Sequence, residues 1–164
     1  MRNTLTIGGL ALVAIIIGAF VFLRGPGNVS NENSAAAVAV PFAELARGTE
    51  STIGRRVNYL IASQDQFREL WEVIGAEEPA PDIDFSEDVV AAVFAGEKPN
   101  AGYDIAVSKV EDADARTITV TLAEPSNDCV YAQMITAPYQ IIKLPNTALK
   151  FVHEDISTTA DCSE

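Results

Sequence analysis

The stretch VVAAVFAGEKPNAGYDIAV, residues 89–107, decides the fold of this chain. Its first part, Val89–Ala95, is a continuous apolar run, which predicts a strand covered on both faces. From Tyr103 onward apolar and polar residues alternate, which is typical of a strand with one solvated face. The Gly, Pro and Asn residues between the two parts predict a tight turn, so the stretch indicates two consecutive strands.

The turn contains two glycines and a lysine, which raises the question of a phosphate-binding loop. A loop of the Walker type needs the spacing GxxxxGK[ST] and a helix after it. Gly96 and Gly102 are too far apart and Lys98 lies between them. A strand follows the turn, so no helix N-terminus faces an anion. We therefore expect a structural connection, with Lys98 as an exposed cation.

The stretch SQDQFRELWEVIG, residues 63–75, predicts a helix. Ser63 and Gln66 form a capping box, in which each side chain satisfies a free backbone N–H at the helix start. Gly75 supplies the stop. One helical face carries the apolar side chains that we expect in the core, namely Phe67, Leu70, Trp71 and Ile74.

The remaining apolar segments predict further strands. Residues 117–122 alternate threonine with apolar residues and form an antiparallel hairpin with residues 103–108. Pro138 separates two strand halves, because proline removes a donor from the ladder. The other expected strands are residues 42–47, 57–62, 131–135, 139–144 and 149–153. The elements predict an α+β fold, with an antiparallel sheet of about six strands, one amphipathic helix packed on a face, and a preceding N-terminal transmembrane helix.

That transmembrane helix is predicted from Leu5–Leu23, which contains no charged residue. Its length corresponds to about 28 Å of helix, close to the hydrocarbon thickness of a bilayer. A cleaved signal peptide is the competing interpretation, but its apolar region is normally shorter. We expect a signal anchor at residues 1–24, a flexible linker at residues 25–39 and a folded domain at residues 40–164.

The two cysteines, Cys129 and Cys162, predict one disulfide in an exported domain. It would close a loop of about 34 residues, for which loop entropy gives roughly 3–4 kcal/mol. Two unrelated thiols are the alternative, and the cysteines and the one histidine lack metal-ligand spacing. We therefore expect a single-pass membrane protein whose C-terminal domain lies outside the cytoplasm. Because Arg2 and Arg24 bracket the apolar run, the positive-inside rule does not decide the orientation.

The predicted domain is strongly acidic. Beyond Arg24 the chain has nine basic and 23 acidic residues, a net charge of −14. Like charges repel, which argues against nucleic acid and anionic lipid surfaces as ligands of this domain. Contact with the lipid bilayer is expected through the N-terminal helix alone.

No catalytic constellation is present, and we expect a protein that is not an enzyme and holds no cofactor or metal. A serine nucleophile would need a strained turn such as GxSxG, which is absent. His153, the one histidine, is expected on the surface or in an edge strand. The carboxylates Asp82, Asp84, Glu87 and Asp88 form a cluster without the spacing of a calcium loop. An enzyme with an unrecognised carboxylate site remains an alternative.

Three segments carry a family resemblance: NYLIASQDQFRELW at residues 58–71, DFSEDVVAAVFAGEKPNAGYDIAV at residues 84–107, and APYQIIKLP at residues 137–145. Their order resembles the PrcB C-terminal domain family. The resemblance implies a non-catalytic, stabilising module associated with a subtilisin-like protease complex, and it brings no catalytic residues.

We therefore predict a membrane-anchored, extracytoplasmic binding module, an accessory or stabilising subunit of an envelope protease near the membrane. The expected partner contacts are Lys98, Asn100, Tyr103, Pro138 and Tyr139, from loop position and exposed aromatics. Burial of Tyr103 and Tyr139, which would then only shape the fold, is the other interpretation. A protease inhibitor and a stand-alone domain that binds a small molecule or carbohydrate are the alternative functions.

Overall fold

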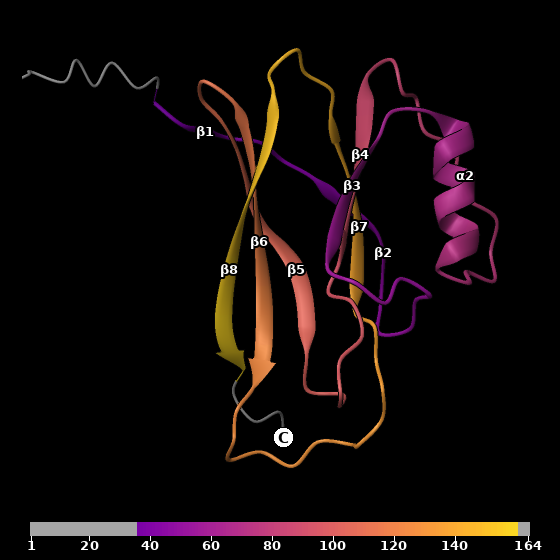
Figure 1. Cartoon of the computed structure of the whole chain (residues 1–164). Helices are drawn as coiled ribbons and strands as arrows, with labels where there is room; N and C mark the ends of the chain where they lie inside the picture. Colours follow the sequence, from indigo (N-terminus) through magenta and orange to yellow (C-terminus); the bar gives the residue numbers. More distant parts are fainter. Residues whose placement is uncertain (1–35, 161–164) are drawn as a thin grey trace, which may run out of the picture. The chain divides into compact units, whose positions relative to one another are not determined.

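A computed structural model of the chain describes residues 36–160 (Figure 1). The predicted transmembrane anchor, residues 1–24, and most of the predicted linker lie outside the described residues. Within residues 36–160, no helix is long and apolar enough to span a lipid bilayer. The elements in chain order are β1 (Val38–Ala39), β2 (Ala43–Gly48), β3 (Val57–Ile61), α2 (Gln64–Val73), β4 (Asp88–Phe94), β5 (Asp104–Asp112), β6 (Arg116–Pro125), β7 (Tyr139–Pro145) and β8 (Phe151–Ala160).

The described strands form two four-stranded sheets (Figure 1). Sheet A has the order β1-β5-β6-β8, and sheet B has the order β2-β7-β4-β3. The α+β class is confirmed, but the prediction of one sheet of about six strands is wrong. The physical reason lies in β4, which is apolar on both faces and therefore needs a packed layer on each side.

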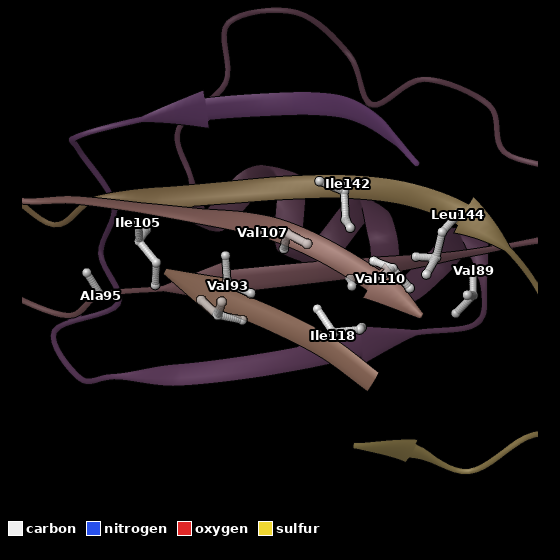
Figure 2. Close-up of a cluster of buried hydrophobic side chains, with 11 residues drawn as sticks. Val89, Val93, Ala95, Ile105, Val107, Val110, Ile118, Ile142 and Leu144 are labelled. Atoms are coloured by element: carbon white, nitrogen blue, oxygen red, sulfur yellow. The ribbon is translucent and has the colours of Figure 1, made fainter. Parts of the chain in front are cut away.

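Alternate side chains of β4 are buried in two separate hydrophobic cores, one on each face of the strand. Val89, Ala91 and Val93 pack between the sheets, against β5, β6 and β7 (Figure 2). Val90 and Phe94 point the other way and pack with the residues of helix α2. Successive side chains of a strand face opposite sides, so one continuous apolar run serves both layers.

Helix α2 confirms the predicted cap. Ser63 Oγ accepts a hydrogen bond from Gln66 N at 3.4 Å, and Gln66 Oε1 accepts one from Ala62 N at 3.4 Å. Phe67 and Leu70 are buried against sheet B. Trp71 packs on this core while its Nε1 donates to Glu78 O at 2.8 Å, so it is a core residue with a satisfied polar atom.

The strands that follow β4 agree with the prediction only in part. The hairpin of β5 and β6 is confirmed, with a bulge between Val107 and Lys109. The strand expected at residues 149–153 extends to Ala160 and pairs with β6 in parallel. The strand expected at residues 131–135 does not form, because this segment bonds to another loop instead of joining a sheet.

Polar side chains connect the two sheets at their margins. Arg116 is buried, holds the Asp112 carboxylate with two bonds of 2.7 Å, and also donates to Pro145 O. Gln140 Oε1 accepts from Val107 N at 2.6 Å and so joins β7 to β5. Each of these buried groups is hydrogen-bonded, as burial of a polar group requires.

Candidate functional site

Two long connections meet at one end of the domain. Lys98 N donates to Thr136 O at 2.7 Å, Thr136 N donates to Lys98 O at 3.0 Å, and Ala101 N donates to Ala132 O at 3.1 Å. These bonds join the β4–β5 connection to the β6–β7 connection, which run together below the strands in Figure 1. We call residues 97–103 and 129–136 together the loop surface.

The structure brings three of the predicted contact residues together on the loop surface. Lys98 Nζ lies 5.2 Å from the centroid of the Tyr103 ring, a cation–π contact. Asn100 Oδ1 accepts from Gly102 N at 2.9 Å and so closes the turn. All three side chains are half-buried, which leaves part of each available to a partner.

The expected exposure of Pro138 and Tyr139 is wrong, because both residues are buried. Pro138 is buried, and its carbonyl accepts from Ala95 N at 2.9 Å. Tyr139 is only 8% exposed and stacks on Phe94 with the ring centroids 5.9 Å apart. Burial raises the pKa of the Tyr139 hydroxyl. These two residues therefore shape the fold.

Two glycines allow the β4–β5 connection to lie close to neighbouring segments, Gly96 to the backbone before β3 and Gly102 to the β6–β7 connection. Gly96 has φ +74°, and a Cβ there would lie 2.7 Å from the backbone carbonyl carbon of Arg55. A Cβ on Gly102 would lie 2.7 Å from the side chains of both Pro125 and Tyr131. The glycines of the opening stretch therefore serve close packing, as expected for a structural connection.

The sequence did not reveal the exposed apolar side chains of the loop surface. Val130 is 100% exposed, Ile135 73% and Met134 49%. The exposure of Met134 and Ile135 is not predicted because the pattern of residues 131–135 indicates a strand, in which such residues would be buried. The available signal was the preceding Ser126-Asn127-Asp128 run, which is typical of a loop.

A disulfide holds the start of this apolar segment. Cys129 is disulfide-bonded, and its N–H donates to Ser126 O at 3.3 Å. The last pair of the β6–β8 ladder, Pro125 with Ala160, brings the end of β8 beside the start of the loop. Cys162 lies outside the described residues, so its pairing with Cys129 stays a prediction.

A hollow of about 420 Å³ borders the loop surface. Its lining includes Ile135, Thr136 and the carboxylate Glu97 of the loop surface, together with the carboxylates Glu50 and Glu72 from other segments. None of these carboxylates forms an ion pair with another residue in the range 36–160. The hollow therefore combines an apolar side chain with unpaired negative charge.

The other sequence candidates lie elsewhere. His153 is in the edge strand β8. In the carboxylate cluster, Asp84 accepts from Ser86 N at 3.0 Å and from Ser86 Oγ at 2.5 Å, and these bonds lower the pKa of its carboxyl. Asp88 pairs with Lys143 at 2.9 Å. Across residues 36–160, no group of three or more His, Cys, Asp or Glu side chains is arranged to hold a metal ion.

Comparison with known protein families gives a match to part of the chain. Residues 89–145 match the family model described as PrcB C-terminal, which confirms the resemblance over this range. The match covers strands β4 to β7 and both connections of the loop surface. No curated protein and no solved structure matches the chain.

Proposed function

We propose that this chain, whose residues 89–145 belong to the PrcB C-terminal family, is a non-catalytic accessory subunit that binds an envelope protease through its loop surface. The family supports association with a protease complex. The predicted anchor at residues 1–24 and the linker after it, whose root-mean-square span is about 20 Å, would keep the domain close to the membrane. The partner is therefore a protein at or near the membrane.

The exposed apolar side chains of the loop surface carry this proposal. Val130, Met134 and Ile135 lie within one short segment and expose much of their surface to solvent. Clustered exposed apolar side chains mark contact sites, because a partner removes them from water. Burying one such side chain contributes about 1.5–3 kcal/mol.

The neighbouring hollow supplies the polar part of the contact. Its three carboxylates, Glu50, Glu72 and Glu97, surround a space bordered by Ile135. A Lys or Arg side chain of the partner would pair with these carboxylates while its aliphatic stem lies against Ile135. Lys98, whose Nζ lies over the Tyr103 ring, would meet an acidic group of the partner.

Capture from native membranes tests the proposal. The tagged full-length chain is crosslinked in its native membranes, purified and identified with its partners by mass spectrometry. The test variant carries Met134→Ser and Ile135→Ser, and the matched control carries Ile156→Ser on β8, where Ile156 is also exposed. We expect a protease to be recovered with the natural chain and the control, and to be reduced at least about tenfold with the test variant.

Two results would contradict this function. If no protease is recovered, the accessory role fails. If a protease is recovered equally with the test variant, the protein binds it through another surface. Circular dichroism of each variant establishes that it is folded before its capture is compared.

The loop surface also favours a second function, inhibition of a protease. The disulfide-bonded Cys129 directly precedes the fully exposed Val130, and backbone bonds fix the segment that follows. A constrained, exposed segment suits insertion into an active-site cleft because little ordering entropy is lost. Progress curves of a panel of serine proteases with the purified chain test this, and linear curves unchanged by the chain would exclude it.

A further inference from the structure

Strand β3 forms an open edge of sheet B. Of the described strands, only β4 pairs with it, from Val57↔Phe94 to Ile61↔Val90. The backbone groups on its other side are thus free to pair with an added strand. The strand contains no Lys or Pro, the residues with which natural proteins block such edges.

A first hollow opens on the inner face of β3. It has a volume of about 160 Å³ and lies where β3 and β4 face β6 and β8. Its lining includes Leu60, Val93, Ile118 and Phe151, with Asn58 and His153 as polar members. Leu60 is 47% exposed although it points toward this apolar space. An apolar cavity of roughly 150 Å³ accepts a group of benzene size.

A second hollow opens on the outer face of β3, between the strand and helix α2. It has a volume of about 330 Å³. Its lining is mainly apolar, with Ile53, Tyr59, Leu70 and Val73, and Glu69 lies on its helix side. The two hollows are thus on opposite faces of one open strand. Because successive side chains of a strand face opposite ways, a strand added beside β3 would direct alternate side chains into the two hollows.

The negative charge of Glu69 distinguishes between two possible binding partners of the β3 edge, a second copy of this chain and a basic segment of another protein. Glu69 forms no ion pair with another residue in the range 36–160. The neighbouring Arg68 pairs with Asp65 at 3.1 Å. A second copy of this chain, paired edge to edge through β3, would bring a second Glu69 to the same edge and a second acidic domain beside the first. A segment that carries a Lys or Arg toward helix α2 would instead neutralise this carboxylate.

We infer that the β3 edge binds an extended peptide segment of another protein by strand addition. The segment has apolar side chains on both faces, one for each hollow, and a basic residue on the face toward α2. The β3 site is built around a strand edge and the loop surface around two connections, so they are two contact regions, and the outer hollow of β3 borders the hollow beside the loop surface at Val73.

A peptide selection tests the β3 site. The immobilised full-length chain is exposed to a display library of random dodecapeptides, and the affinities of the enriched peptides are measured. We expect enriched peptides with neighbouring apolar residues and a Lys or Arg. In Leu60→Lys, which places a charge at the edge, their affinity should fall at least about tenfold. The matched control is Ala43→Lys on the opposite edge strand β2, where Ala43 is exposed and the affinity should not change.

Two further variants separate strand addition from simple apolar contact. N-methylation of alternate peptide backbone nitrogens should abolish binding, because it removes the donors that pair with β3. The charge reversal Glu69→Lys should shift selection from basic to acidic peptides. The inference is overturned if no peptide is enriched, if Leu60→Lys binds as well as Ala43→Lys, or if N-methylated peptides bind unchanged. Crosslinks that join the β3 strands of two copies would identify a second copy as the occupant and would also overturn it.

Discussion

Replacing Gly96 by alanine should destabilise the domain more than the same change at Gly75. Both glycines have positive φ, +74° and +65°, so both substitutions impose a left-handed conformation on alanine. That conformation costs roughly 1–2 kcal/mol for a residue with a Cβ. Gly75 has no atom within 4 Å of the added Cβ and is therefore the matched control.

At Gly96 a steric term is added. The new Cβ would lie 2.7 Å, 2.8 Å and 2.9 Å from backbone atoms of Arg55 and Arg56. Backbone cannot rotate away as a flexible side chain can, so one of the two segments must shift. Overpacking of this kind typically costs about 1–3 kcal/mol. We therefore expect Gly96→Ala to lose about 2–5 kcal/mol of unfolding free energy, against about 1–2 kcal/mol for Gly75→Ala.

The measurement is urea unfolding of the full-length chain. The fluorescence of Trp71, the one tryptophan, reports the unfolding of the core around helix α2. Equal losses for the two variants, or a smaller loss at Gly96, would refute the close approach of the β4–β5 connection to the Arg55–Arg56 backbone. The proposed packing at the base of the loop surface would then be wrong.

Three further predictions concern the rest of the domain. Arg116→Met should lose about 1.5–3 kcal/mol, as for a hydrogen bond to a charged group. Arg116 lowers the folded-state pKa of Asp112, so the stabilisation from this ion pair is complete above the unfolded pKa of about 4 and is lost as the pH falls through the lower folded pKa. The difference between the urea unfolding curves of natural chain and variant should therefore shrink in acid to the part that comes from the bond of Arg116 to Pro145 O. Cys129→Ser, Cys162→Ser and the double variant should each lose roughly 3–4 kcal/mol in thermal unfolding, and additive losses would disprove the pairing. Burial raises the pKa of Tyr139, so its ionisation destabilises the fold as the pH rises. In an ultraviolet absorbance titration of the four tyrosines, the last ionisation should therefore disappear in Tyr139→Phe.

The local elements were predictable because their signals lie within short stretches of sequence. Ser63 is the N-cap of helix α2 as the capping-box pattern predicted, although the Gln66 side chain accepts from the N–H of Ala62, one residue before the N-cap. The alternation in residues 103–108 and 117–122 predicted the hairpin of β5 and β6. In these cases one residue spacing, of 3.6 or of 2, decides the conformation without any distant partner.

The candidate site was predictable only in part. Lys98, Asn100 and Tyr103 lie on one connection, and their turn residues identified it as a loop. The sequence pattern places Met134 and Ile135 in a strand. It does not show whether a neighbouring strand is available to pair with this segment. Tyr139 was assigned to the surface, since nothing local indicates that its ring stacks on Phe94.

The sequence by itself determined the class of the domain, its helix, the strand buried on both faces and the match of residues 89–145 to the PrcB C-terminal family model. Only the tertiary structure decided that the described strands divide into two sheets and that β8 runs parallel to β6. The physical reason is that a strand's own residues specify which of its faces are apolar, whereas its neighbours are chosen by the packing of distant segments. The same packing left β3 as an open edge between two hollows and the apolar side chains near Cys129 exposed.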